Sequence, residues 1–333
     1  MGKKVITVDD YFNGVIQSDR VTLSKAITLI ESGKPEDKES AIDLVSKCLP
    51  HAGKSIRIGI TGTPGVGKST FIESFGQYLV EQGKKVAVLA VDPSSTLSKG
   101  SILGDKTRMT KLAVHENAFI RPSASRGVLG GVALSTRDTI ILCEAAGYDI
   151  ILIETVGVGQ SETIVHSITD FFMLLTLSGG GDELQGIKRG IMEMADLIVI
   201  NKVEDHNLEN AKILKNQLIN ALSLFTIGAD EWQTKVEMCS AITGKGIEAV
   251  WKTVENYIRL TKTNSSFDEK RKKQRIDAFR ELSGQQFMHF VHQNEDFKNL
   301  VTKIEHDIVT EKLSVHAAIR ELISRITITI KSS

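Results

Sequence analysis

Short runs of consecutive apolar residues recur along the middle of the chain and are separated by longer segments of mixed polarity. Consecutive rather than alternating apolar residues indicate strands that are covered on both faces, and the segments between them suit crossover helices. We therefore predict an α/β fold with a doubly wound, mostly parallel sheet. The predicted strands are Ile56 to Ile60, Val86 to Val91, Ile150 to Ile153, Phe171 to Leu177, Leu197 to Ile200 and Val236 to Met238.

Both ends of the chain have helical patterns. Apolar residues recur at helical spacing from Leu23 to Ile30, a second helical pattern follows Pro35, and further helical stripes occupy the tail. The three predicted parts are a helical extension (1–52), the sheet domain (53–262) and a helical arm (263–333). An amphipathic arm without a sheet of its own must pack either on the main domain or on another subunit, and we expect the second, in a homodimer.

Composition narrows the class of protein. The 333 residues are 41% hydrophobic, and 41 basic residues balance 41 acidic ones, so no strong field favours nucleic acid or an anionic membrane. We interpret the basic stretch Lys270–Arg275 as a solvated helix surface. Cys48, Cys143 and Cys239 lie too far apart for a disulfide framework or a zinc site. No signal-peptide pattern and no apolar run of about 20 residues is present, so we expect a cytoplasmic protein without a membrane partner.

The most specific motif follows the first predicted strand. Residues 62–69 match the pattern G-x-x-x-x-G-K-[ST] and precede a segment with helical apolar spacing. In such a loop, backbone N–H groups surround phosphate oxygens, Lys68 reaches the β- and γ-phosphates, and the Ser69 hydroxyl is a Mg²⁺ ligand. The sequence therefore predicts a nucleoside triphosphate site. The residues expected to line it are Gly62, Thr63, Pro64, Gly65, Val66, Gly67, Lys68, Ser69 and Thr70.

Acidic residues end two of the predicted strands. Asp92 follows the strand that starts at residue 86, and Glu154 follows the strand that starts at residue 150, with Gly157 three residues later. Carboxylates at the ends of neighbouring parallel strands can complete a Mg²⁺ site, and the glycine N–H can meet the γ-phosphate. A cap on the following turn is the alternative interpretation of Asp92. Asp105, in a segment able to fold over the nucleotide, is a further metal candidate.

The next loop bears on which base is bound. Asn201, Lys202 and Glu204 follow a predicted strand at the place where GTPases have N-K-x-D. In that motif the Asn supports the loop, the Lys covers the guanine, and the acid accepts hydrogen bonds from guanine N1 and N2. Glu204 has one methylene more than the usual Asp, so the neighbouring Asp205 is an alternative acceptor.

A second base-binding loop matches the pattern S-A-x-x-G-x-G-I over residues 240–247. It begins with Ser240, Ala241 and Ile242, and a backbone amide at this position can meet guanine O6. Adenine has a donor where guanine has that acceptor. We therefore predict GTP and GDP, rather than ATP, as the nucleotides, with Mg²⁺ as the metal.

Together with these motifs, four longer stretches make the chain resemble the MeaB/ArgK-type GTPases, a group that includes the methylmalonyl-CoA mutase-associated proteins. The stretches are residues 91–95, 100–109, 154–162 and 179–190. The resemblance implies a P-loop NTPase fold of the SIMIBI type with helical extensions at both ends. It also implies a homodimeric GTPase that binds an adenosylcobalamin-dependent acyl-CoA mutase. In that family the nucleotide state gates delivery of the cofactor to the mutase and removal of damaged cofactor.

The resemblance also implies roles for particular residues. It places Asp92, Asp105 and Glu154 at the metal. A mobile switch over residues 180–188 would bring Lys188 to the nucleotide or the partner. Glu204 departs from the usual Asp of the family, which bears on guanine specificity more than on membership.

The catalytic residues expected on these grounds neutralise charge better than they orient water. They are Lys68, Glu154, Gly157 and Lys188. Small regulatory GTPases have Gln directly after the switch glycine, where this chain has Val158, and Gln160 lies two residues further on. We therefore expect slow intrinsic hydrolysis that a partner stimulates.

Two other classes share this core and remain alternatives. One is an ATP-using kinase or ATPase of the arginine/ornithine transport type, which Glu204 keeps open. The other is a metal-delivery GTPase, which would be expected to carry a His-rich or Cys-paired metal motif that this sequence does not have.

Overall fold

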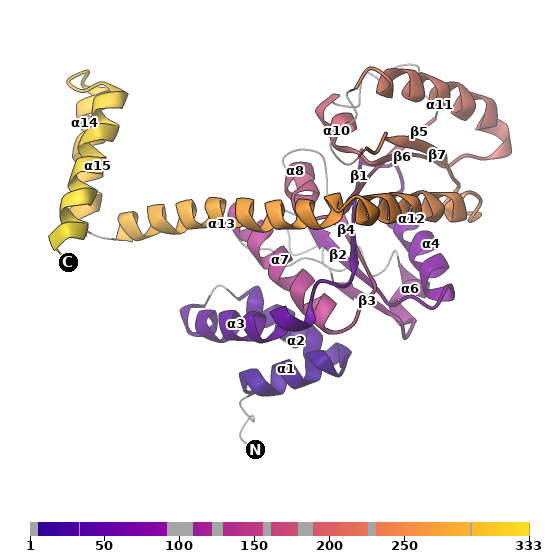
Figure 1. The fold of residues 1–333 in the computed structure, drawn as a ribbon, viewed down its shortest axis with the longest axis horizontal. Coiled ribbons are helices and arrows are strands. Elements are labelled where there is room, and N and C mark those ends of the chain that lie inside the picture. Colours follow the sequence, from indigo (N-terminus) through magenta and orange to yellow (C-terminus); the bar gives the residue numbers. More distant parts are fainter. Residues whose placement is uncertain are drawn as a thin grey trace. The chain divides into compact units, whose positions relative to one another are not determined.

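The computed structural model describes residues 6–32, 34–91, 109–121, 129–155, 161–178, 189–225, 231–293 and 295–332. The strands in these ranges form one seven-stranded sheet in the order β3-β2-β4-β1-β5-β6-β7, and every neighbouring pair is parallel (Figure 1). The α/β fold with a doubly wound parallel sheet is therefore confirmed. The strands are β1 (Ile56–Gly62), β2 (Val86–Val91), β3 (Ala118–Arg121), β4 (Ile150–Thr155), β5 (Phe171–Leu177), β6 (Leu197–Asn201) and β7 (Lys235–Met238).

The edge strand β3 is not among the strands that the sequence pattern predicts. It has four residues, and among the described strands it pairs with β2 alone. Its apolar run covers only Ala118 to Ile120, and Arg121 follows directly. Such a run is shorter than the roughly four to eight residues typical of a buried strand, so the pattern does not separate it from a loop.

Helices cover both faces of the sheet, because alternate residues of each strand point to opposite faces. Ile58 and Ile60 of β1 pack in one buried cluster with α4 and α12, whereas Ile151 and Ile153 of β4 pack in another with α1, α2, α3 and α7 (Figure 1). A third cluster joins β5 and β6 to α11. The elements concerned are α1 (Val8–Ile16), α2 (Arg20–Ile30), α3 (Pro35–Cys48), η1 (Leu49–His51), α4 (Lys68–Glu81), α6 (Thr110–Val114), α7 (Leu129–Ala145), α8 (Ser161–His166), α10 (Arg189–Met194), η2 (Asp205–Asn207), α11 (Leu208–Leu222) and α12 (Ile247–Thr263).

The N-terminal flank contains α1, a helix that the sequence analysis did not predict. The helix begins with a capping box, in which the Thr7 hydroxyl accepts from the Asp10 N–H and the Asp10 carboxylate accepts from the Thr7 N–H. Val15 is its one buried residue. Val8, Tyr11 and Phe12 pack against the same buried cluster as Val15, so the apolar residues of α1 do recur at helical spacing, and the signal was available in the sequence.

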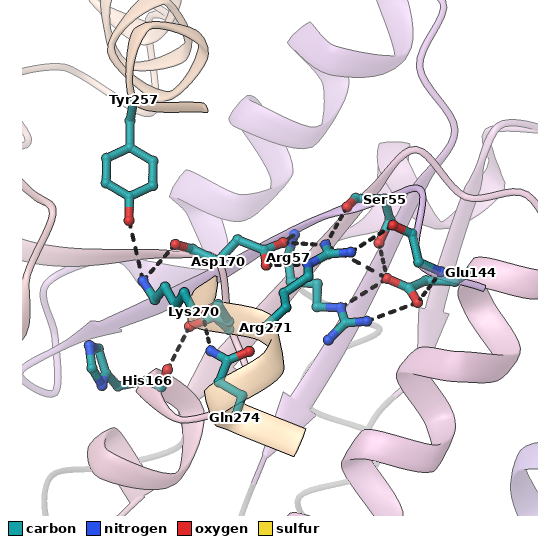
Figure 2. Close-up of polar contacts among 11 residues, drawn as sticks. Ser55, Arg57, Glu144, His166, Asp170, Tyr257, Lys270, Arg271 and Gln274 are labelled. Atoms are coloured by element: carbon teal, nitrogen blue, oxygen red, sulfur yellow. Dashed lines mark hydrogen bonds and ion pairs between the residues drawn. The ribbon is translucent and has the colours of Figure 1, made fainter. Parts of the chain in front are cut away.

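A buried group of charges lies at the amino edge of the sheet, where β1 and β5 begin. We call it the Arg271 network, and it comprises Arg57, Glu144, Asp170 and Arg271. The Arg271 guanidinium donates to both carboxylate oxygens of Asp170 at 2.7 and 2.6 Å, and Arg57 does the same to Glu144 at 2.9 Å for each bond (Figure 2). The Arg271 side chain is 7% exposed and that of Asp170 is 1% exposed. The network therefore fixes residues 266–274, the first turns of α13 (Ser266–Gln293), by charges that all have partners.

Further contacts hold the same part of α13. The Lys270 ammonium donates to the Asp170 carbonyl oxygen at 2.7 Å, and the Gln274 amide donates to the Thr169 carbonyl oxygen at 2.8 Å (Figure 2). Lys272, by contrast, is more than half exposed. The interpretation of the basic stretch as a solvated surface is therefore wrong for Lys270 and Arg271, because these two side chains face the sheet domain.

The chain divides into two compact units, Met1–Gln274 and Arg275–Ser333, with the boundary inside α13. In the second unit, α14 (Glu295–Val309) and α15 (Val315–Ser332) pack against each other and bury Phe297. The three-part division proposed from the sequence stays a prediction. Among the described residues, no helix combines the length and apolar character needed to cross a membrane.

Candidate nucleotide-binding site

The phosphate-loop motif lies at the carboxyl edge of the sheet, between the end of β1 and the start of α4. β1 ends at Gly62 and α4 begins at Lys68, so the strand, loop and helix follow in the order that the motif requires. Gly67 has a φ of +91°, and a Cβ atom there would lie 3.0 Å from Nδ2 of Asn201. A residue with a side chain would be strained at this position. Glycine thus lets Asn201, at the end of β6, approach the loop closely.

Lys68 folds back over the loop. Its ammonium donates to the Gly62 carbonyl oxygen at 2.7 Å. Desolvation lowers the pKa of Lys68, and the negative charges of Glu154 and Glu162 oppose that shift. A half-buried cation held by backbone carbonyls gains strongly from an anion, because hydrogen bonds between charged groups are the stronger ones. The position of Lys68 therefore suits phosphate oxygens.

Ser69 and Glu154 come together next to Lys68. Parallel pairing sets Ile60 of β1 opposite Glu154 of β4, and the Ser69 hydroxyl lies 3.4 Å from a Glu154 carboxylate oxygen. Glu154 is 4% exposed. Hydroxyl and carboxylate oxygens are the ligands that Mg²⁺ prefers, and Mg²⁺ commonly takes one or two of them plus water and phosphate. The donor set present here fits that ion.

The described residues contain no group of three or more His, Cys, Asp or Glu side chains placed to hold a metal. A site closed entirely by such side chains is therefore not seen in this part of the chain. Two oxygen donors beside a phosphate loop agree better with a cation that is shared with a nucleotide than with a structural metal centre.

Asn201 joins the phosphate loop to the second base-binding loop. It is buried, its Nδ2 donates to the Val66 carbonyl oxygen at 3.0 Å, and its Oδ1 accepts from the Ala241 N–H at 3.2 Å. The Cys239 thiol lies 3.5 Å from the same Oδ1. Lys202 extends over the loop, and its ammonium donates to the Gly65 carbonyl oxygen at 2.8 Å. Three segments distant in sequence thus meet at one place.

Glu204 lies in the turn directly before η2, as the N-cap residue of that helix. Its carbonyl oxygen accepts from the Asn207 N–H at 3.1 Å at the start of η2, and one of its carboxylate oxygens lies 3.6 Å from Nδ1 of His206. The side chain is 40% exposed and can therefore reach solvent or a ligand. Asp205, the alternative acceptor, is fully exposed and lies 3.9 Å from the Lys245 ammonium.

The 240–247 loop has an inner and an outer side. Ser240 is buried, and its hydroxyl accepts from the Thr243 N–H at 3.3 Å, which closes the turn. The Ile242 side chain is 74% exposed. Ser240 therefore shapes the loop, Ala241 contacts Asn201, and Ile242 presents an apolar surface at its rim.

Four predicted site residues lie outside the described residues and are not placed by the structure. They are Asp92, Asp105, Gly157 and Lys188, and the same holds for Gln160. Conversely, a pair of hydroxyls that no motif indicated lies beside the site. Thr61 and Thr155 are buried, and their hydroxyl oxygens are 2.9 Å apart, which joins β1 to β4 just before the phosphate loop. A polar residue ending an apolar run was the available signal.

The geometry agrees with what comparisons with known proteins show. A model of the family described as "Methylmalonyl Co-A mutase-associated GTPase MeaB" matches residues 23–296. The chain is 44% identical over 306 residues to GTPase ArgK of Escherichia coli (strain K12), covering 92% of each chain. It is 48% identical over 260 residues to the mouse protein named "Methylmalonic aciduria type A homolog, mitochondrial", covering 75% of this chain and 63% of that one.

A solved structure gives the same result at the level of the fold. The crystal structure of a protein named LAO/AO transport system kinase has a TM-score of 0.79 and 35% sequence identity, covering 98% of this chain and 100% of the other. The family match extends over most of the chain and includes the phosphate loop, Glu154, Asn201 and Ala241. This chain therefore belongs to the methylmalonyl-CoA mutase-associated GTPase (MeaB) family.

Proposed function

We propose that this protein is a Mg²⁺-dependent GTPase that acts as a G-protein chaperone of an adenosylcobalamin-dependent acyl-CoA mutase, with methylmalonyl-CoA mutase as the expected partner. The observation that carries the nucleotide part is the position of Asn201, which bonds the phosphate loop at Val66 and the base-binding loop at Ala241. Family membership supports the partner. Gating of cofactor delivery and removal of damaged cofactor belong to the same proposal.

In the proposed reaction, water attacks the γ-phosphorus of GTP, the bond to the β-phosphate oxygen breaks, and GDP and inorganic phosphate leave. Lys68 and the amides of residues 63–69 bind the β- and γ-phosphates. Ser69 and Glu154 would hold Mg²⁺, which when bound neutralises charge on the phosphate oxygens. The family resemblance adds Asp92 and Asp105 to the metal site.

The Gly157 N–H would meet the γ-phosphate, and the family resemblance brings Lys188 to the nucleotide or the partner. Since Val158 cannot orient water, we expect slow hydrolysis by the isolated protein and faster hydrolysis when the mutase is bound. The base would lie against Lys202 and the Ala241 amide, with Glu204 accepting from guanine.

A homodimer through the helical arm completes the proposal. Val315 and Ile319 lie one helical turn apart on α15 and are 57% and 52% exposed. Apolar side chains at this spacing form a stripe that a second copy would cover. Sedimentation equilibrium of the full chain tests this point, with twice the mass of one chain expected and a monomer contradicting it.

The chaperone role is tested by measuring phosphate release from GTP. The protein is assayed alone, with purified methylmalonyl-CoA mutase, and with an unrelated protein of similar size as a control. We expect slow release alone and a clear acceleration with the mutase only. Fast release by the isolated protein, or release that the mutase leaves unchanged, would contradict the proposal.

A further inference from the structure

Asn207 occupies the N-cap position of α11, where an asparagine side chain normally accepts a hydrogen bond from the first turn of the helix. Its side chain makes no such bond here. Instead, its Oδ1 accepts from the Glu204 N–H at 2.8 Å, and its Nδ2 donates to the Lys202 carbonyl oxygen at 2.9 Å. The side chain is therefore turned away from the helix and toward the loop that follows β6.

These two bonds fix the main chain on both sides of Val203. Lys202 has a φ of +58°, which residues with a side chain seldom adopt. A bond to the Lys202 carbonyl helps to hold this conformation. In return, the Glu204 carbonyl oxygen accepts from the Asn207 N–H at 3.1 Å. The two residues proposed to meet the base, Lys202 and Glu204, thus depend on one amide side chain for their direction.

We infer that Asn207 is a positioning residue that sets the preference for guanine over adenine. This inference rests on the proposed function, because it concerns the same base site. Asn207 acts through the main chain of Lys202 and Glu204 and has no contact with the phosphate loop among its hydrogen bonds. The loop is held separately, by the bond from Asn201 to Val66. Loss of Asn207 therefore weakens base recognition and leaves phosphate binding in place.

The experiment is a calorimetric titration of the full chain with GDP and with ADP, both in the presence of Mg²⁺. The variants are Asn207→Ala, which removes both bonds, and Asn207→Asp, which keeps an acceptor for Glu204 N–H but sets an oxygen against the Lys202 carbonyl. Asn216→Ala is the matched control, because Asn216 is an exposed asparagine of the same helix. Thermal unfolding of each variant checks that it is folded.

We expect Asn207→Ala to weaken GDP binding about tenfold, as the loss of two hydrogen bonds suggests, and to leave ADP binding within about twofold of the wild type. Asn207→Asp also lowers the ratio of GDP to ADP affinity, and it carries the test if the alanine variant does not fold. Asn216→Ala leaves both affinities unchanged. The losses from Asn207→Ala and Glu204→Ala are not additive in the double variant, because both act on the same loop.

A variant that binds both nucleotides more weakly by the same factor would show a merely structural role and overturn the inference. The inference would also be overturned if the wild type prefers GDP and the Asn207 variants keep the same ratio of GDP to ADP affinity. That result would leave the proposed function intact. A wild-type protein that binds neither nucleotide would refute the proposed function itself, and a wild type that binds both equally would refute the guanine preference on which the inference rests.

Discussion

The two edges of the sheet are both polar, but their charges are arranged differently. At the amino edge, the Arg271 network sets Arg271 against Asp170 and Arg57 against Glu144, each with two hydrogen bonds. At the carboxyl edge, Lys68 and Lys202 donate to carbonyl oxygens of the phosphate loop. One edge therefore has complete ion pairs, and the other has cations held by neutral groups.

This difference separates a structural role from a binding role. Buried ion pairs add little net stability over apolar packing, but removing one partner leaves a buried charge uncompensated. They therefore hold the first turns of α13 in place on the sheet domain. Cations on carbonyl oxygens can exchange those partners for phosphate oxygens, which bind them more strongly. Substitutions at the two edges should accordingly change different measured quantities.

The largest effect is expected from Arg271→Ala at the amino edge. The variant leaves the buried Asp170 carboxylate without its bidentate partner, so we expect the free energy of unfolding to fall by about 3–5 kcal/mol. Urea denaturation measures it, and Lys272→Ala, on the exposed side of the same turn, is the control with less than about 1 kcal/mol of change. Equal stability of the Arg271→Ala variant and the wild type would contradict the structural role.

Lys68→Ala should show the opposite pattern at the carboxyl edge. Loss of a charged donor to two phosphates is expected to weaken GTP binding about 100-fold, whereas the free energy of unfolding changes by less than about 1 kcal/mol. Calorimetry gives the first quantity and urea denaturation the second. A stability loss as large as that of the Arg271 variant would remove the distinction between the two edges.

Glu154→Gln tests the metal part of the carboxyl edge. The amide keeps the shape of the side chain but loses the negative charge beside Ser69. We expect the Mg²⁺ concentration for half-maximal GTP hydrolysis to rise about tenfold, with GDP binding in the absence of Mg²⁺ little changed. Hydrolysis that follows the same Mg²⁺ dependence in both proteins would exclude Glu154 from the metal site.

The smallest effect concerns pH at the amino edge. Burial, and next the charge of Lys270, lower the pKa of His166 from its ordinary value of 6.5 to about 4. Since the folded state resists protonation, the stability that is present above pH 6.5 is lost as the pH falls toward 4. We expect the wild type to lose about 1 kcal/mol more than His166→Gln between pH 7 and pH 5.5.

The control for the pH prediction is His316→Gln, which replaces an exposed histidine of the helical arm. It should follow the wild type at every pH. Parallel stability curves of the wild type and His166→Gln would show that His166 titrates normally and would contradict the prediction.

The carboxyl edge could be predicted largely from the sequence, because its chemistry is local. The phosphate loop is one contiguous motif, and a parallel sheet brings strand ends such as Glu154 and Asn201 to the same edge. The amino edge could not be predicted from the sequence. Asp170, the carboxylate partner of Arg271, lies 101 residues away from it in the chain. A run of basic residues is, in addition, typical of a solvated helix.

Two smaller features were also not predicted from the sequence. The strand β3 was missed because three apolar residues are too few for a period. Asn207 was missed because an asparagine before a helix usually indicates a cap, and the sequence does not say which way its side chain turns.

The central claim is that the carboxyl edge binds guanine nucleotide, and the most direct test is a calorimetric titration of the wild-type chain with GDP and, separately, ADP, at equal Mg²⁺. We expect a single site per chain for GDP and an affinity for ADP at least about tenfold lower, as one lost set of base contacts implies. No heat with GDP, or equal affinities for the two nucleotides, would contradict it.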